Sequence, residues 1–239
     1  YNILVYYAEH PDCKVSEIDF RDEYSRKVIE SIHRKEEDER SETLIDLLKK
    51  QVDNDPEKTA IECYGKSITY RKLWEKASKI AGELKERGIT RGRCVVISAE
   101  KCIEFVASMY GILMAGGICT VISDEYPTQR QEFICRETDA LIVLYHSRKL
   151  TAAVPSLCID DCFFARSEIH LSDEVQSNDV AHIIFTSGTT GTPKGVCLTQ
   201  KNLLSTIMYN AVYDLHLGKN TVFMHISAQT FDASLLEIH

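Results

Sequence analysis

The chain has 239 residues, of which 44% are hydrophobic and 27% charged, enough apolar side chains for one large domain or two small ones. Its 28 Lys and Arg against 36 Asp and Glu give a formal net charge of −8, which argues against nucleic acid as the main partner. Its apolar runs are too short to cross a bilayer, so we expect no membrane partner either.

The chain contains 9 cysteines, and none of them has C-x-x-C spacing. The closest pair is Cys158 and Cys162, with no histidine at a zinc-ligand distance. We therefore expect reduced thiols, a cytoplasmic location and no metal site. Cys94, Cys119 and Cys197 lie in apolar runs and are expected to be small core residues.

The first 40 residues differ in pattern from the rest. A continuous apolar run predicts a strand at 3–7, alternating apolar residues predict a second strand at 15–20 after a turn at Pro11, and a helix follows at 24–32. The charged run 34–40 predicts a solvated linker. Two strands and one helix cannot bury a core alone, and the first residue is not Met, so we expect a piece of a longer polypeptide.

A helix is expected to begin after Thr43, which stands in the N-cap position with Asp46 at N3, and to end near 54–56. The clearest apolar periodicity in the chain predicts a second helix over 70–87, between Thr69 and Gly88. Further strands are expected at 59–63, 67–69, 94–98, 118–122, 141–145, 157–159, 180–185, 195–198 and 222–224. Further helices are expected at 102–114, 127–136 and 201–213.

Strand, helix and strand alternate through this second region. That rhythm predicts an α/β fold with mostly parallel sheets and helices on both faces, plus the short N-terminal hairpin-helix tail.

A loop rich in glycine and hydroxyl residues follows the strand at 180–185. It reads Thr186, Ser187, Gly188, Thr189, Thr190, Gly191, Thr192, Pro193, Lys194 and Gly195. Glycine allows a close approach of the backbone to a ligand, and successive N–H groups can form an anion-binding concavity. Lys194 adds a point charge that suits phosphate. The loop predicts a phosphate cradle, and a plain surface loop of turn formers is the alternative.

The loop does not match the P-loop of nucleoside triphosphatases, G-x-x-x-x-G-K-[ST]. Counting from Gly188, Pro193 occupies the second glycine position. Gly195 follows Lys194 where Ser or Thr would hold magnesium, so we reject a P-loop.

The pattern T-S-G-T-T-G-x-P-K-G instead resembles the signature loop of the adenylate-forming superfamily, which contains acyl-CoA synthetases, luciferases and the adenylation domains of nonribosomal peptide synthetases. In that family the loop grips the β- and γ-phosphates of ATP. The resemblance implies that the phosphates are bound by Thr186, Ser187, Gly188, Thr189, Thr190, Gly191, Lys194 and Gly195.

Phe231-Asp232-Ala233-Ser234 resembles the fourth adenylation motif of peptide synthetases. There the matching aspartate binds the α-ammonium group of the amino acid, and a carboxylate in an apolar pocket does need a cation. The resemblance implies that Asp232 binds substrate and that Ala233 and Leu236 line the side-chain pocket. From the sequence alone, Asp232 as a helix N-cap is the alternative.

Two further polar residues flank the loop. His182 lies on the preceding strand, where a histidine hydrogen-bonded to backbone is expected rather than a general base. Gln200 stands where the peptide-synthetase pattern commonly has histidine, and it is assigned no role.

The resemblance also divides the chain. Residues 1–33 resemble the end of a condensation domain, 34–42 are a linker, and 43–239 resemble the N-terminal part of an adenylation domain. The implied enzyme is an ATP-dependent ligase that converts ATP and an amino acid to aminoacyl-AMP and pyrophosphate. It would then pass the aminoacyl group to phosphopantetheine on a partner carrier domain, with Mg²⁺ on the phosphates.

The implied partners are the amino-acid substrate and the condensation and carrier domains of the same synthetase. The family's catalytic lysine and acidic magnesium ligand would lie beyond residue 239. We therefore expect no catalytic or metal-binding residue in this chain, and no adenylation by the chain alone. Two alternatives are an acyl-CoA synthetase-type ligase and a non-catalytic fragment that docks a neighbouring domain.

Overall fold

The computed structural model describes residues 6, 8–14, 42–150, 153–164, 175–186, 193–209, 217–218 and 220–239. The chain forms two compact units, Tyr1–Glu39 and Arg40–His239. In the first unit Tyr6, Ala8 and Glu9 are helical, and the His10 N–H donates to the Tyr6 carbonyl at 2.9 Å, so the strand expected at 3–7 is wrong where it is described. The turn at Pro11 is confirmed.

The expected strand at 15–20 and helix at 24–32 lie outside the described residues. The Arg40–His239 unit carries all the remaining elements that the structure describes, and it is considered by itself below.

Helix α3 (Leu44–Asn54) begins where its capping residues predict. The Thr43 side chain accepts the Asp46 N–H at 3.2 Å, and the Asp46 carboxylate accepts the Thr43 N–H at 2.7 Å. These two bonds satisfy backbone donors that the first helical turn leaves unpaired, so the reciprocal cap fixes the start of the helix.

Strands β1 (Thr59–Cys63) and β2 (Lys66–Thr69) form a two-stranded antiparallel hairpin. Tyr64 and Gly65 connect them with φ values of 50° and 74°. Positive φ at both central residues gives the turn a twist that matches the strands, so the strands expected at 59–63 and 67–69 form a hairpin.

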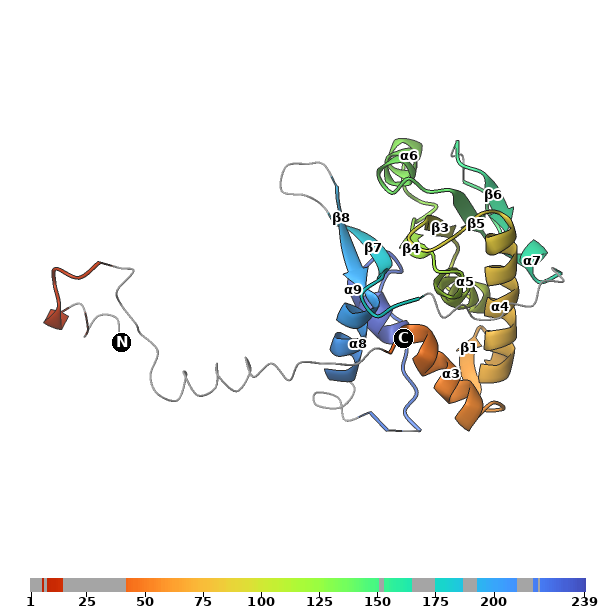
Figure 1. Cartoon of the computed structure of the whole chain (residues 1–239), viewed down its shortest axis with the longest axis horizontal. Helices are drawn as coiled ribbons and strands as arrows, with labels where there is room; N and C mark the ends of the chain where they lie inside the picture. Colours follow the sequence, from red (N-terminus) through yellow and green to blue (C-terminus); the bar gives the residue numbers. More distant parts are fainter. Residues whose placement is uncertain are drawn as a thin grey trace. The chain divides into compact units, whose positions relative to one another are not determined.

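A six-stranded sheet forms the centre of the unit, with the order β6-β5-β3-β4-β7-β8 (Figure 1). Its strands are β3 (Cys94–Ser98), β4 (Ile118–Val121), β5 (Ile142–Tyr145), β6 (Ser156–Cys158), β7 (Val180–Thr186) and β8 (Lys194–Thr199). The first five strands in this order are parallel, and β8 is antiparallel to β7. The predicted mostly parallel α/β fold is therefore confirmed.

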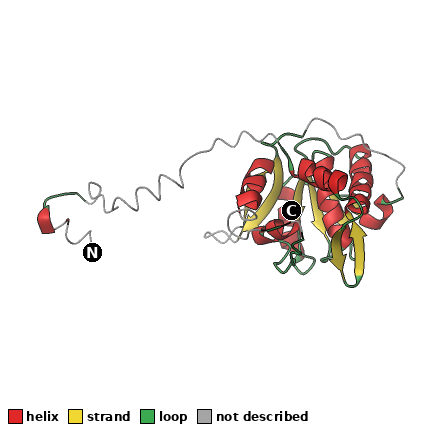
Figure 2. Ribbon diagram, turned by 90° about the horizontal axis from the view of Figure 1, so that it is seen from below, coloured by secondary structure: helices red, strands yellow, loops and turns green. Residues whose placement is uncertain are grey.

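Helices lie on both faces of this sheet (Figure 2). They are α4 (Tyr70–Glu86), α5 (Ile103–Met114), α6 (Thr128–Glu137), α7 (Ile159–Cys162), α8 (Gln200–Tyr209) and α9 (Asp232–Ile238). Val95 and Ile97 belong to the large core with α3, α4 and α5, whereas Val96 belongs to a smaller core with α6. Successive strand residues face opposite ways, so one strand contributes to both cores.

Several expectations need correction. The apolar run at 222–224 is not a strand; Val222 is 92% exposed and Met224 73%, and no strand of the described residues pairs with them. Apolar residues make a strand only when a neighbour supplies hydrogen bonds and a surface to cover. Cys94 and Cys119 are buried as expected, but Cys197 is exposed because it lies on the edge strand β8.

The end of β6 differs as well, because Ile159 starts the short helix α7 instead of continuing the strand. The end expected for the helix at 201–213 lies outside the described residues.

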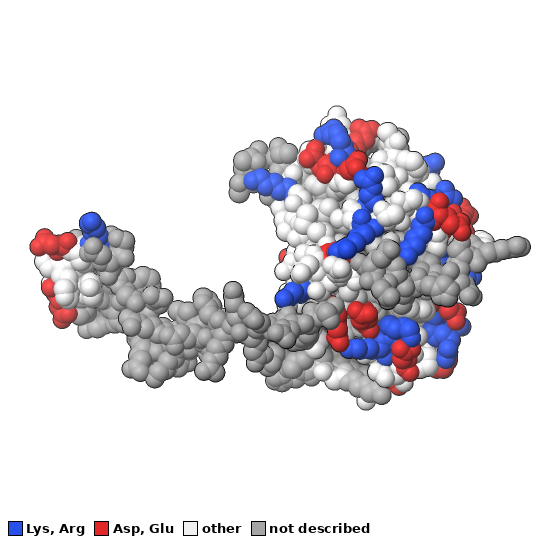
Figure 3. Space-filling view, in the orientation of Figure 1, with Lys and Arg blue, Asp and Glu red and all other residues white. Residues whose placement is uncertain are grey.

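Charged side chains of both signs share the surface of this unit. On the face seen in Figure 3, Lys and Arg side chains occur together with Asp and Glu side chains. In the part of the chain that the structure describes, no helix combines the length and apolar character required to span a bilayer.

Candidate functional site

The predicted phosphate loop joins β7 to β8. Thr186, the last residue of β7, pairs with Lys194, the first of β8, and Phe185 pairs with Gly195. Thr186, Lys194 and Gly195 are exposed. The remaining loop residues named for phosphate binding lie outside the described residues: Ser187, Gly188, Thr189, Thr190 and Gly191. The loop is thus held at both ends by strands that pair up to its first and last residues.

Gly195 has a packing reason to be glycine. A Cβ at this position would lie 3.0 Å from Ile183 Cγ2 and 3.3 Å from Phe185 Cζ. Phe185 itself packs edge-on against Phe133 of α6, with ring centroids 6.3 Å apart. A side chain at 195 would therefore require Ile183 and Phe185 to shift by a few tenths of an ångström, so glycine allows the close packing of this part of the hairpin.

Lys194 is the basic residue at the mouth of the hairpin. Among the residues that the structure describes, no carboxylate forms an ion pair with it. An exposed ammonium group beside an amide-rich loop fits a polyphosphate, because phosphate oxygens accept hydrogen bonds from both.

Asp232 is the first residue of α9 and is exposed. Its carboxylate accepts the Ala233 N–H at 2.8 Å, while Phe231 occupies the N-cap position without a side-chain cap. Ala233 is exposed and Leu236 is half-buried. Neither of the two cavities described below is lined by Asp232, so the described residues alone do not enclose this carboxylate.

The segment before α9 is tied firmly to that helix. The Glu237 carboxylate accepts the N–H groups of Ile226 and Ser227 at 3.0 and 2.9 Å and the Ser227 hydroxyl at 2.7 Å. These bonds lower the pKa of Glu237 against the opposing effect of desolvation. His225 Nε2 lies 2.8 Å from the Ser234 hydroxyl. These hydrogen bonds therefore hold the segment 225–231, which precedes Asp232, against α9.

His182 lies on β7, and its environment differs from expectation. It was expected to bond backbone, but its Nε2 lies 3.3 Å from His239 Nε2, and His239 Nδ1 lies 3.2 Å from the Tyr110 hydroxyl. Burial, and the neighbouring His239, lower the pKa of His182 well below its usual value. Burial lowers the pKa of His239 to about 4. Both imidazoles are therefore neutral at physiological pH.

A small cavity of about 10 Å³ lies beside His182 and connects β4 and β7 to residues that precede α9. Gln229 and Thr230 contribute its polar lining from the α9 side. The elements that carry the two predicted binding motifs thus meet around His182.

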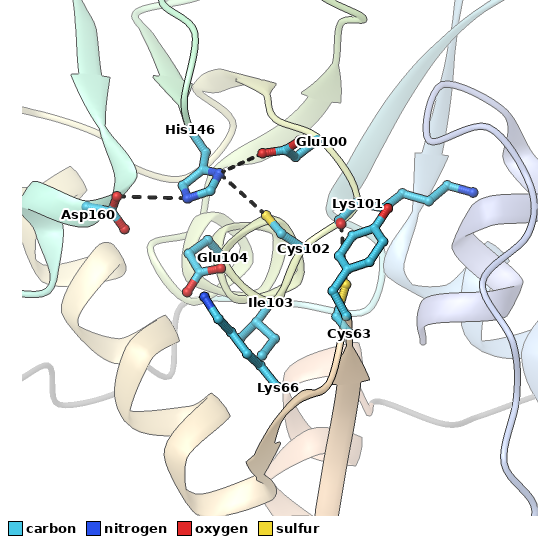
Figure 4. Close-up of a pocket in the computed structure, with 10 residues that line it drawn as sticks. Cys63, Lys66, Glu100, Lys101, Cys102, Ile103, Glu104, His146 and Asp160 are labelled. Atoms are coloured by element: carbon cyan, nitrogen blue, oxygen red, sulfur yellow. Dashed lines mark hydrogen bonds and ion pairs between the residues drawn. The ribbon is translucent and has the colours of Figure 1, made fainter.

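A larger cavity of about 390 Å³ lies elsewhere in the unit (Figure 4). His146 stands in it with Nδ1 3.6 Å from Glu100 Oε1 and Nε2 3.8 Å from Asp160 Oδ2. The Cys102 thiol is 3.8 Å from His146 Nδ1, and burial raises its pKa to about 12, so it stays protonated. This thiol is a helix cap that accepts the Phe105 N–H at 3.4 Å, not an activated nucleophile.

That cavity lies at the carboxyl ends of β3 and β5. Strands β5 and β3 are neighbours in the sheet. After β3 the chain continues to β4 on one side of this pair, and after β5 it continues to β6 on the other side, so the strand order reverses between them. Ligand sites of open α/β sheets often occur at such points. Within the described ranges, no three His, Cys, Asp or Glu side chains come together as a metal-binding group.

Sequence reasoning missed the cluster around His146 and the contact between His182 and His239. The first could have been found from polar residues that follow two neighbouring strands. The second joins residues 57 positions apart and has no local signal.

Comparison with known proteins agrees with the fold. Residues 48–239 match the model of the AMP-binding enzyme family. Gramicidin S synthase 2 of Brevibacillus brevis is 30% identical over 231 residues, and tyrocidine synthase 3 of Brevibacillus parabrevis is 32% identical over 203 residues. These alignments cover 94% and 82% of this chain but only 5% and 3% of the relatives.

Solved structures give the same picture. The nonribosomal peptide synthetase FmoA3 superposes with a TM-score of 0.83 at 27% identity, over 92% of this chain and 24% of that one. For the fold alone, O-succinylbenzoate coenzyme A synthetase of Bacillus subtilis superposes with a TM-score of 0.75 at 19% identity, over 83% and 53%. With its loop, its sheet order and the match over most of its length, this chain belongs to the AMP-binding enzyme family.

Proposed function

We propose that the chain is the ATP-binding and amino-acid-binding part of a nonribosomal peptide synthetase adenylation domain. The complete reaction would convert an amino acid and ATP to aminoacyl-AMP and pyrophosphate, and then transfer the aminoacyl group to phosphopantetheine on a carrier domain. Relatives of this kind match nearly the whole chain, although the chain spans a small fraction of their length.

The observation that carries the proposal is the hairpin of β7 and β8. Thr186 and Lys194 pair at its mouth, and a Cβ at Gly195 would contact the Ile183 and Phe185 side chains at 3.0 and 3.3 Å. Lys194 at this place, next to a loop rich in glycine and hydroxyl residues, suits the β- and γ-phosphates of ATP. Hydrogen-bond donors of this loop would stabilise the charge that builds up on the departing pyrophosphate. Magnesium would contribute further charge compensation on the phosphates when bound.

Asp232 supports an amino acid over a fatty acid as the substrate. Its carboxylate lies at the start of α9, exposed towards any ligand that approaches the helix. An ammonium group is the natural counter-ion for it, whereas a fatty acid offers none. Condensation and carrier domains of the same synthetase would be the partners of the complete enzyme, and the region 1–33 would belong to the former.

The test is amino-acid-dependent exchange of pyrophosphate into ATP by the complete synthetase. We expect Lys194→Ala to lower exchange about 10- to 100-fold, because a charge-assisted contact is worth about 1.5–3 kcal/mol. Lys149→Ala, which alters an exposed lysine of another loop, is the matched control and should have no effect. Full exchange in the Lys194→Ala enzyme would defeat the proposal.

The substrate class is tested separately with Asp232→Asn. This change keeps the shape of the side chain and removes its charge, so the KM for the amino acid should rise while that for ATP is unchanged. Exchange driven by fatty acids and not by amino acids would instead identify an acyl-CoA synthetase-type ligase. If a synthetase with the Lys194→Ala, Gly195→Val double substitution kept normal exchange, the loop would not be needed for ATP binding. That result would favour the alternative in which this chain docks a neighbouring domain and takes no part in catalysis.

A further inference from the structure

A chain of polar rings, of which Tyr110 and His182 are buried and His239 is half-buried, joins the two elements that carry the proposed binding motifs. His182 belongs to β7, four positions before Thr186, and His239 follows α9, seven positions after Asp232. The 3.3 Å contact between their Nε2 atoms is a direct link between these elements. Tyr110 of α5 contacts the second ring from the core side, at 3.2 Å from His239 Nδ1.

The link is rigid for three physical reasons. His182 is 1% exposed, so water does not compete for its ring nitrogens. The two imidazoles meet edge to face with centroids 5.4 Å apart, and His239 meets Tyr110 in the same way at 5.1 Å. Strand β7 pairs with β4 on one side at Cys119 and with β8 on the other at Leu198, which fixes the backbone of His182 itself.

The contact also requires a defined proton arrangement. A bond between two imidazole nitrogens needs one N–H donor and one lone-pair acceptor, so at least the accepting ring must be neutral, and two neutral rings must be in complementary tautomers. Their lowered pKa values satisfy this condition at physiological pH. A buried polar pair of this kind holds one geometry, because a shifted partner would leave a ring nitrogen unpaired in the core.

We propose that His182 and His239 are positioning residues that hold the phosphate hairpin and the Asp232 helix at a fixed separation. The inference rests on the proposed function, since it gives the pair a role in aligning the amino-acid carboxylate with the α-phosphate of ATP. Neither histidine touches the substrates in this role. Their effect falls on the rate of the chemical step, which depends on sub-ångström alignment, rather than on the affinity of either site.

Two substitutions at one position separate the contacts. In His239→Gln the amide reaches the place of Nε2 and keeps the bond to His182, whereas in His239→Asn it reaches the place of Nδ1 and keeps only the bond to Tyr110. Both variants replace the ring by the same chemical group. The first should therefore retain most of the alignment, and the second should lose it.

The experiment measures kcat and KM for ATP and the amino acid in the complete synthetase. We expect His239→Asn and His182→Phe to lower kcat about 10- to 100-fold, with both KM values within about threefold of the original, and His239→Gln to restore most of the kcat. The His239→Asn, His182→Phe double variant should be no slower than either single one, because both remove the same bond.

A spectroscopic measurement keeps the inference testable even if a variant fails to fold. In this chain with ¹⁵N-labelled histidine, the bond should appear as a nitrogen–nitrogen coupling between the rings of His182 and His239. Absence of that coupling, or equal kcat in the Asn and Gln variants, would overturn the inference. If the wild-type synthetase showed no amino-acid-dependent exchange, the proposed function would be overturned instead. The coupling measurement tests the contact between the two rings without relying on that activity.

Discussion

His182 and His239 show how burial sets the charge of a residue. In the unfolded chain a histidine titrates near pH 6.5, whereas both pKa values are lowered in the folded protein, that of His239 to about 4. Between these values the unfolded state binds more protons than the folded state. The free energy of unfolding must therefore fall as the pH is lowered from about 6.5 towards 4. The neighbouring Tyr110 and Cys119 have raised pKa values and stay neutral throughout.

We predict that removing these two histidines flattens this dependence. In the original chain, each of the two histidines lowers the free energy of unfolding by up to about 1.4 kcal/mol for each pH unit below 6.5. The His182→Phe, His239→Phe double variant should lack this contribution, so its free energy of unfolding should fall less steeply with decreasing pH. Urea unfolding of the chain at pH 7, 6, 5 and 4.5 measures it. His10→Phe, at an exposed histidine of the first unit, is the control and should leave the slope intact. An unchanged slope in the double variant would contradict the buried neutral pair.

Gln200 acquires a role that the sequence did not reveal. It is 1% exposed, and its Oε1 accepts the Leu44 N–H at 3.0 Å, so the first residue of α8 satisfies a free donor at the start of α3. Helix starts leave such donors unpaired unless a side chain or water reaches them.

We predict that Gln200→Leu destabilises the chain by about 1–3 kcal/mol, because it leaves the Leu44 N–H buried without an acceptor. Gln129→Leu on the exposed face of α6 is the same substitution without a buried partner, and should stay within about 0.5 kcal/mol. Denaturant midpoints of the two variants decide the matter, and equal midpoints would rule out a stabilising Gln200 bond.

At the scale of elements, α4 and α5 pack closely against each other at Gly111. A Cβ on Gly111 would stand 2.8 Å from Ile80 Cβ and 2.9 Å from the Ala77 carbonyl oxygen. Packing requires glycine here, because the backbone of α5 at Gly111 lies directly against the Ile80 side chain and the Ala77 carbonyl oxygen of α4.

We predict that Gly111→Ala destabilises the chain by about 1–3 kcal/mol through overpacking, even though alanine favours the helical state by up to about 1 kcal/mol. Gly218→Ala is the control, because no atom lies within 4 Å of the added Cβ. Thermal unfolding of both variants compares them directly, and a stabilised Gly111→Ala would show that α4 and α5 can separate at no cost.

At the scale of the whole molecule, the packing belongs to one unit. Among the described residues, both apolar cores are built from residue 44 onwards, within Arg40–His239. The large core combines residues of six helices and one face of the sheet, which gives that unit a core of its own.

We therefore predict that a chain beginning at Arg40 folds as the 239-residue chain does. Its Tm should lie within about 2 °C of that of the 239-residue chain, since a shift of this size corresponds to well under 1 kcal/mol. Circular dichroism on heating measures it. A large fall in Tm would mean that residues 1–39 support the core.

The sequence by itself determined the parts with local causes. Thr43 with Asp46, Tyr64 with Gly65, and the periodicity of 70–87 each act through neighbours within one or two turns of chain, so the pattern contains the answer. The glycine-rich loop was equally readable, because its chemistry lies in consecutive residues.

The tertiary structure alone decided the rest. Cys197 and the run 222–224 are as apolar as buried strands, but their exposure depends on whether a neighbour covers them. The strand order, the Gln200 bond to α3 and the meeting of His182 with His239 join residues far apart in the chain. Local propensity has no access to such pairs, since their energy comes from contacts that exist only after the sheet and its helices have assembled.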